Sequence, residues 1–145
     1  MGQKRVTTTV SGSPDENAGG SASAKKAFKK QVFKGAVNIF SSYNNTIVSV
    51  ADPNGNVFSH SSAGMLGFKG TKKSTPYAAT LVGKDAVEKA KKFGFQEAKV
   101  TVSGIGPGRE AAIRGVASSG INIVSIVDVT PMAHNGVRPT KPRRV

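Results

Sequence analysis

The sequence predicts an α/β fold in which a mixed five-stranded sheet, an antiparallel meander plus a parallel β-α-β part, is flanked by helices. Two observations predict it. From residue 36 to 62, apolar and polar residues alternate between tight turns, as in three short antiparallel strands. After residue 75, two helical patterns alternate with two more strand patterns, which is typical of parallel strands joined by crossover helices. The 145 residues suit one domain with tails.

The predicted meander has a clear turn signal. Val37 and Ile39 lead the first strand, and Ile47, Val48 and Val50 mark the second. Asp52-Pro53-Asn54-Gly55 is a strong turn sequence, and the third strand runs from Val57 to Ser62.

The first predicted helix begins with Thr75 as N-cap and Pro76 at its first position. It runs to about Phe93 and stops at Gly94. Asp85 and Lys89 form a favourable i,i+4 pair. The apolar stripe of this helix consists of Ala79, Val82, Ala86, Ala90 and Phe93, and its small residues predict close packing on a sheet.

A second strand-helix-strand unit follows. Ala98 to Val102 is the fourth strand, and Arg109 to Ser119 is a helix that ends at Gly120. The apolar run from Ile121 to Val129 predicts a parallel strand that is buried on both faces.

The charge balance points to a polyanionic partner. Lys and Arg number 21 against 8 Asp and Glu, so the formal charge is +13. Such a domain repels itself unless a polyanion is near, and nucleic acid is the commonest such partner, before an anionic membrane surface. We expect a disordered, basic extension at residues 1–34, a globular domain at 35–130 and a basic tail at 131–145.

Other function classes are disfavoured. The chain has no cysteine, and no apolar run is long enough to span a membrane. His60 and His134 have no further ligands at metal spacing, and no paired carboxylates or nucleophilic triad suggest catalysis. We therefore expect no enzyme activity, cofactor, metal, membrane or small-molecule substrate.

Three segments are candidates for RNA contact. Gly67 to Thr75 is a glycine-rich loop with three lysines and no acid, for which a solvated flexible loop is the alternative. Asn44 and Asn45 can hydrogen-bond sugars or bases and Tyr43 can stack, although hairpin turn chemistry alone explains the two asparagines.

The third segment is the turn from Gly104 to Gly108, which precedes Arg109 at a helix start. Free backbone N–H groups there can bind a phosphate. Two alternatives remain: a dinucleotide site with Asp128 near the ribose, which the glycine spacing and Pro107 disfavour, and a plain tight turn.

Asn135-Gly136 is chemically notable. Glycine leaves its nitrogen unhindered, so it can attack the asparagine side chain to form a succinimide, whose hydrolysis yields isoaspartate. A simple turn is the alternative.

Five motifs in register resemble one family. They are Ser42-Tyr43-Asn44-Asn45-Thr46-Ile47-Val48, Gly67-Phe68-Lys69-Gly70 through Ala79, Gly106-Pro107-Gly108-Arg109-Glu110, Asp128-Val129-Thr130-Pro131 and His134-Asn135-Gly136-Val137-Arg138-Pro139. Together they resemble the bacterial-type ribosomal protein S11 family of the small subunit, over about Lys29 to Val145. The resemblance departs at His60, where the family often has tryptophan, and residues 1–24 have no counterpart.

The resemblance implies a ribonuclease-H-like fold without catalytic acids and a structural role in the cytoplasmic ribosome. It implies binding of small-subunit ribosomal RNA on the platform, near the exit site and the messenger RNA path. Small-subunit proteins seven, eighteen and twenty-one would be neighbours, and Asn135 would be the isoaspartate position. The rival hypotheses are a general, chromatin-like nucleic-acid-binding protein and a nuclease.

The candidate RNA-binding residues combine the basic loops and ends with the family motifs. They are Lys29, Lys30, Lys34, Asn44, Asn45, Phe68, Lys69, Lys72, Lys73, Ser74, Arg109, Arg114, His134, Arg138, Lys141, Arg143 and Arg144.

Overall fold

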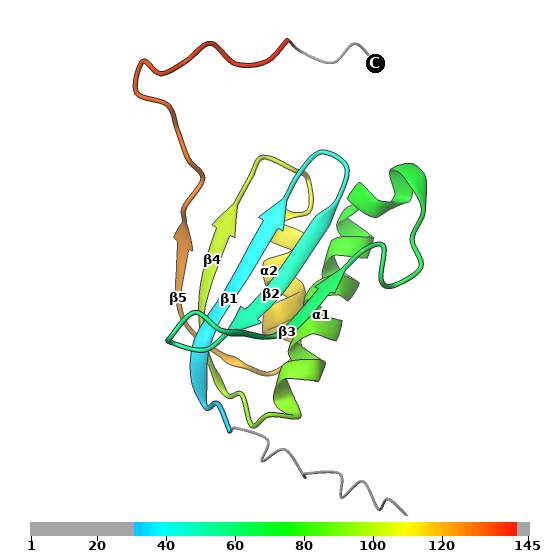
Figure 1. Ribbon diagram of the computed structural model, residues 1–145. Coiled ribbons are helices and arrows are strands. Elements are labelled where there is room, and N and C mark those ends of the chain that lie inside the picture. The colour runs from blue at the N-terminus through cyan, green and yellow to red at the C-terminus, as the bar shows by residue number, and fades with distance from the viewer. Residues whose placement is uncertain (1–30, 142–145) are drawn as a thin grey trace, which may run out of the picture.

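The computed structural model describes residues 31–141, which form one mixed five-stranded sheet and two α-helices (Figure 1). The strands are β1 (Lys34–Ser41), β2 (Thr46–Ala51), β3 (Val57–Ser62), β4 (Glu97–Ser103) and β5 (Asn122–Asp128). The helices are α1 (Pro76–Lys91), α2 (Arg109–Ser118) and the short 3-10 helix η1 (Gly70–Ser74). The predicted α/β class and mixed sheet are confirmed.

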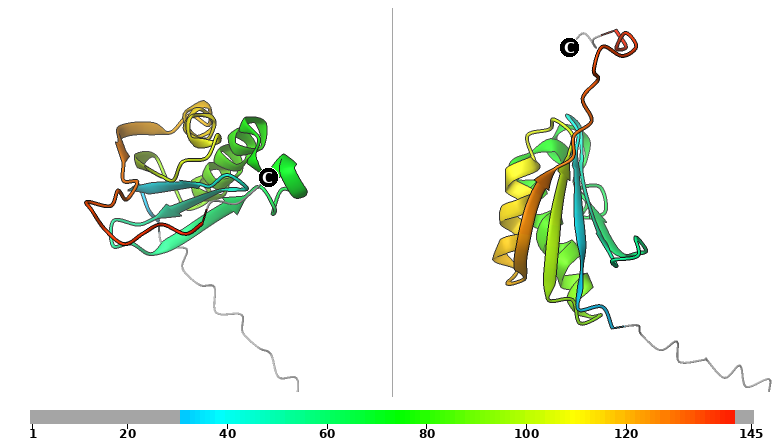
Figure 2. Two further views of the ribbon diagram at one scale, coloured as in Figure 1. Left: turned by 90° about the horizontal axis from the view of Figure 1, so that it is seen from above. Right: turned by 90° about the vertical axis from the view of Figure 1, so that its left-hand side faces the viewer.

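The strand order is β3-β2-β1-β4-β5. The meander pairs are antiparallel, with Ile39 opposite Val48, whereas β4 runs parallel to both β1 and β5. Because parallel strands need crossovers, α1 and α2 carry the chain back across the sheet, and both lie on the same face (Figure 2). The other face has no helix over it in the part of the chain described.

The core lies between the helices and that covered face. Inward residues of the sheet, such as Val37, Val48 and Val100, are fully buried. Of the predicted α1 stripe, the positions from Ala79 to Ala90 are also fully buried, so the packing of this helix on the sheet is confirmed. Small residues on the helix keep it close to the β-branched residues of the strands.

The ends of α1 follow their sequence signals. The Thr75 hydroxyl accepts a hydrogen bond from the Ala78 N–H at 3.3 Å, and Pro76 occupies the first turn. The helix ends at Lys91, two residues before the predicted Phe93, and Gly94 then takes the left-handed conformation with φ of 83°.

A polar contact ties α1 to the sheet. The buried Ser61 hydroxyl on β3 donates to the Asp85 carboxylate at 2.6 Å, and Lys89 pairs with the same oxygen at 2.6 Å. Burial raises the pKa of Asp85, but the hydrogen bonds from Lys89 and Ser61 outweigh it and lower the pKa overall. The predicted Asp85–Lys89 pair is confirmed.

Two expectations are corrected. The basic segment expected to be wholly a loop contains η1 from Gly70 to Ser74. The prediction that the last strand is buried on both faces is wrong: β5 is parallel but is the edge strand, and Val124 and Ile126 are 67% and 55% exposed. Its apolar run indicates the parallel strand type and carries no information on whether a neighbour covers the outer edge.

No helix in residues 31–141 is both long and apolar enough to cross a lipid bilayer.

The two helices touch through glycine. A Cβ added to Gly115 would lie 2.4 Å from the Thr80 carbonyl oxygen, and one added to Gly83 would lie 2.7 Å from the Ala112 carbonyl oxygen. The Thr80 hydroxyl also donates to the Ala111 carbonyl at 3.2 Å. The helix backbones are therefore in direct contact, and neither site has room for a methyl group.

Gly115→Ala is expected to destabilise the protein. In an open helix this change stabilises by about 1 kcal/mol, but the clash with Thr80 converts the gain into a net loss of about 1–3 kcal/mol. Urea unfolding followed by circular dichroism measures it. The control Ala117→Ser, on the exposed side of α2, should stay within about 0.5 kcal/mol. A more stable G115A variant would contradict the packing.

Candidate nucleic-acid interface

Several loops meet at one end of the sheet, where the parallel strands β1, β4 and β5 finish (Figure 1). They are the 42–45 turn, the 104–108 turn and η1 with the preceding Lys69, and the chain leaves β5 for the tail at the same end. Both α1 and α2 begin there, so the positive ends of both helix dipoles face this surface. We call these loops, together with Arg109 and the tail, the loop end.

The glycines of the 104–108 turn are explained by close packing. Gly106 donates to the Ser41 carbonyl at 2.9 Å, and a Cβ on Gly104 or Gly106 would lie 2.2 Å from the carbonyl oxygens of Ser41 or Ser42. Gly104 also has φ of 94°. Close packing and a positive φ therefore explain why glycines occur here, and no bound dinucleotide is needed to explain them. This agrees with the interpretation of the segment as a tight turn.

The two asparagines of the 42–45 turn play different parts. Ser42 donates to the Asn45 carbonyl at 3.2 Å and accepts from its N–H at 3.1 Å, so the backbone of Asn45 closes the hairpin. Asn44 and Tyr43 are exposed at the tip, and the Tyr43 side chain is 68% exposed. Hairpin chemistry thus explains the backbone of Asn45, whose side-chain Oδ1 is buried without a hydrogen-bond partner among the described residues. Asn44 and Tyr43 are accessible to a ligand.

The basic segment is anchored at its end. Ser74 and Thr75 donate to the carbonyls of Thr71 and Lys72 at 3.0 and 2.9 Å, which fixes η1 against the start of α1. Lys69 and Lys72 are exposed and Lys73 is partly exposed, and the sequence holds no acid from residue 63 to 84. These cations therefore have no carboxylate neighbour along this stretch of chain.

An aromatic pair lies beside the lysines. Phe68 and Tyr77 meet edge to face with ring centroids 6.3 Å apart, and Tyr77 is 69% exposed. Sequence reasoning missed Tyr77, although its position one residue after the N-terminal proline of α1 places it at the loop end. An exposed aromatic ring among cations can stack on a base.

Arg109 already has an anion within the chain. Its guanidinium pairs with Asp128 at the end of β5, donates to the Gly104 carbonyl, and reaches the Thr130 hydroxyl at 3.3 Å. It therefore joins the 104–108 turn to the base of the tail. Arg114, by contrast, is 80% exposed and only 3.6 Å from an equally exposed Glu110, a pair worth little in water.

The tail begins at residue 131 and extends away from the sheet (Figure 1). His134, Arg138 and Lys141 are all exposed. Asn135 is the only non-glycine residue of the described chain with positive φ, at 57°. The predicted contacts Lys29, Lys30, Arg143 and Arg144 lie outside the described residues.

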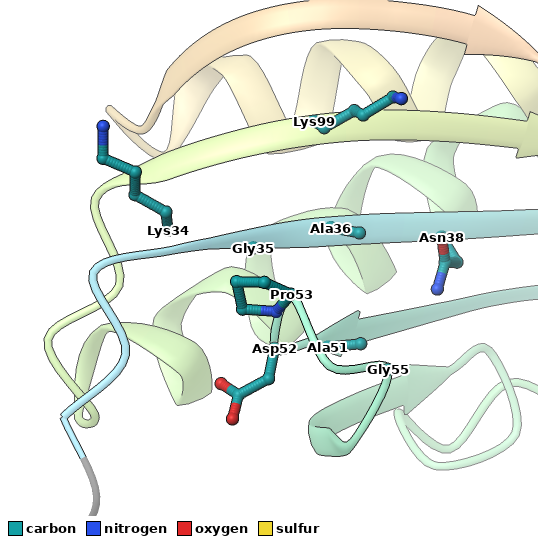
Figure 3. Close-up of a pocket in the computed structure, with 9 residues that line it drawn as sticks. All are labelled: Lys34, Gly35, Ala36, Asn38, Ala51, Asp52, Pro53, Gly55 and Lys99. Carbon is teal, nitrogen blue, oxygen red and sulfur yellow. The ribbon is translucent and has the colours of Figure 1, made fainter.

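Lys34 lies away from the loop end. It opens β1 and pairs with Glu97 at 2.9 Å. With Lys99 it borders a pocket of about 430 Å³ on the helix-free face, floored by small residues of β1 and β2 (Figure 3). In Figure 3 the carboxylate of Asp52 is directed away from both lysines. Sequence reasoning missed Lys99, which the alternation along β4 places on the exposed side.

The carboxylates do not form a nuclease centre. Asp52 follows β2 at one end of the sheet, whereas Asp128 closes β5 at the other (Figure 1). Within residues 31–141, no three His, Asp or Glu side chains are grouped to hold a metal ion. The two acids considered for the nuclease hypothesis thus do not converge.

Asp128 should titrate well below an ordinary carboxyl group. Hydrogen bonds from the Thr130 hydroxyl and N–H, at 2.6 and 2.9 Å, and from Arg109 lower the pKa of Asp128 to about 2. In the unfolded chain the pKa of an aspartate is about 3.9. The ionised Asp128 therefore contributes fully to the free energy of unfolding above about pH 4, and this contribution is lost as the pH falls toward 2. NMR titration of the carboxyl carbon measures this midpoint.

Thr130→Ala should raise that midpoint, whereas Thr101→Ala, which removes a hydroxyl on β4, should leave it in place. A native midpoint near 3.9 would show that the contacts are not formed in solution.

Comparisons with known proteins place this arrangement in a family. The family model described as "Ribosomal protein S11" matches residues 35–144. The chain is 51% identical over 124 residues to the small ribosomal subunit protein uS11 of Aquifex aeolicus (strain VF5). The aligned region covers 86% of this chain and 99% of that protein. The family-model match includes all of the sheet except the first residue of β1, both helices and nearly all of the basic tail. The chain therefore belongs to the ribosomal protein S11 family.

Proposed function

We propose that the chain binds small-subunit ribosomal RNA through its loop end, as a backbone-directed and largely electrostatic contact. Family membership makes the protein a structural, non-enzymatic constituent of the small ribosomal subunit and, as part of the ribosome, cytoplasmic. What remains to be assigned is the surface that contacts the RNA.

One observation carries the assignment. The loop end gathers Lys69, Lys72 and Lys73 with the N-termini of both helices and the start of the basic tail. Of the acids near it, Asp128 is paired with Arg109, and Glu110 in the first turn of α2 lies 3.6 Å from Arg114. Lysines and free helix N–H groups are the donors that phosphates accept from. A surface of this kind attracts RNA through counterion release and holds it without a pocket.

Further contacts are proposed around this centre. Phe68 and Ser74 are sequence neighbours of the lysines, and Asn44 is exposed at the tip of the 42–45 turn at the same end of the sheet. Arg114 can exchange Glu110 for a phosphate at little cost. The remaining proposed contacts are Arg109 at the start of α2, Asn45 in the hairpin, and residues toward the two ends of the chain: Lys29, Lys30, Lys34, His134, Arg138, Lys141, Arg143 and Arg144. We propose that residues 1–34 and 131–145 act as basic arms around the globular domain 35–130.

The finer placement follows the family resemblance. We propose a ribonuclease-H-like fold, which the order β3-β2-β1-β4-β5 with three leading antiparallel strands supports. We also propose a site on the subunit platform, near the exit site and the messenger RNA, with small-subunit proteins seven, eighteen and twenty-one as neighbours. A small domain with both helices on one face of its sheet and with several loops and the C-terminal tail at one end suits such a scaffold role.

Exchanging two loop-end lysines should weaken RNA binding in a salt-dependent manner. For the full-length double variant K72Q/K73Q, the slope of log K against log salt should fall in magnitude by about 1.4–1.8, since each lost phosphate contact removes about 0.7–0.9. Filter binding to a small-subunit rRNA fragment at several salt concentrations measures the slope.

The matched control is K91Q/K92Q, which removes the adjacent lysine pair at the opposite end of α1. Its slope should stay close to that of the unchanged protein. Equal losses in both variants would show that net charge, and not the loop end, directs binding. Equal affinity for duplex DNA and folded rRNA would instead favour a general nucleic-acid-binding protein.

We also propose that Asn135 is converted to isoaspartate. The side-chain amide carbon is attacked by the Gly136 nitrogen and ammonia leaves; water then opens the succinimide ring so that the chain continues through the former side-chain carboxyl. Asn135 is exposed, and within residues 31–141 the Gly136 N–H donates no hydrogen bond to a backbone carbonyl. That nitrogen is thus available for attack.

The chain contains its own control for this reaction. In Asn54-Gly55, the glycine nitrogen donates to the Asp52 carbonyl at 2.9 Å, which should restrain its attack. Peptide mapping of aged protein should therefore find isoaspartate at Asn135 well before Asn54. Unchanged Asn135, or equal conversion at both asparagines, would contradict the proposal.

A further inference from the structure

The outer edge of β5 is apolar and uncovered. Four of its residues or immediate neighbours are substantially exposed: Val124 at 67%, Ile126 at 55%, Val127 at 37% and Val129 at 52%. In the right-hand view of Figure 2, β5 faces the viewer and no described element lies over it. The helix α2 packs on α1 and the strands β1, β2 and β4, and leaves the helix side of β5 exposed.

After Val124, this edge lacks the usual protection against strand pairing. Natural edge strands carry lysine, proline, bulges or covering elements, because their backbone N–H and C=O groups otherwise pair with another chain. Residues 122–128 contain neither lysine nor proline. The one irregularity is at Val124, where the register to β4 shifts, so Ser125 to Asp128 form a regular edge.

The charge of the edge decides what kind of molecule covers it. RNA is held mainly by lysine and arginine, yet residues 122–130 contain no cation, and their one charge, Asp128, is paired with Arg109. On the neighbouring strand β4, the exposed Lys99 is opposite Ser125 on the helix-free side, whereas Ile126 is opposite the buried Val100 on the helix side. A second copy of this chain is disfavoured because each carries a formal charge of +13.

We infer that the edge Ser125–Asp128 pairs with an extended polypeptide segment of a different protein, which adds a sixth strand beside β5 and packs apolar side chains against Ile126 next to α2. Strand addition satisfies the edge backbone groups and covers the exposed apolar surface in one step. It would also give β5 neighbours on both sides, the environment that its apolar sequence is typical of. The inference rests on the proposed function, since the partner is a neighbour in the small subunit.

The test uses small subunits that contain the full-length chain with a photoreactive p-benzoylphenylalanine in place of Ile126. The matched control carries it in place of Val57, which is also 55% exposed but lies on the opposite edge strand, β3. On irradiation, position 126 should crosslink to a protein in several-fold higher yield than position 57. In the subunit, amide hydrogens of residues 125–128 should exchange at least about tenfold more slowly than in the free chain.

A second variant separates pairing from folding. Ile126→Lys should leave the thermal midpoint of the free chain unchanged, because the side chain is exposed, but should weaken retention of the crosslinked neighbour about tenfold relative to Val57→Lys. Three outcomes with chains incorporated into small subunits would overturn this inference but not the proposed function. Position 126 could crosslink only to RNA, it could crosslink only to a second copy of this chain, or positions 126 and 57 could crosslink to protein in equal yield. A chain that does not sediment with small subunits would overturn the proposed function as well.

Discussion

The direct contact between the backbones of α1 and α2 is the constraint on which the architecture depends. Both helices must cover one face of a narrow sheet, and they fit side by side because Gly83 and Gly115 bring no side chain to the crossing. This close approach lets short residues such as Ala86 and Ala90 seal the valines beneath them. The crossovers between the parallel strands start both helices at the same end of the sheet, so a small core supports a large loop surface.

The second close contact fixes that loop surface. Gly104 and Gly106 allow the turn before α2 to lie directly on the β1–β2 hairpin, so the tips of two separate connections become one rigid unit. Arg109 then extends the unit to the end of β5 through Asp128. The glycines and the arginine that the sequence suggests for a phosphate site thus have an internal role, which is to hold together the loops that we propose contact RNA.

Charge and apolar surface are separated on this molecule. The loop end carries Lys69, Lys72 and Lys73 without a neighbouring acid in sequence, whereas the β5 edge carries exposed valine and isoleucine and no cation. A protein whose two surfaces differ so strongly in chemistry is suited to two kinds of partner at once, a polyanion at the strand ends and a polypeptide along the sheet edge. Such a division fits a scaffold within a ribonucleoprotein particle, where RNA and protein neighbours meet the same small domain.

The sequence by itself determined the local elements and the chemical class of partner. Period-two alternation, the Thr75-Pro76 helix start and the glycine helix stops are signals between residues close in the chain, and the unbalanced charge is independent of the fold. Only the tertiary structure decided that β5 is an edge, that Arg109 pairs with Asp128 and that Lys34 lies far from the loop-end lysines. Those facts depend on which strands are neighbours and on distances across the sheet. The sequence of an apolar run or of a lone arginine is the same whether its partner is the chain itself, another protein or a phosphate.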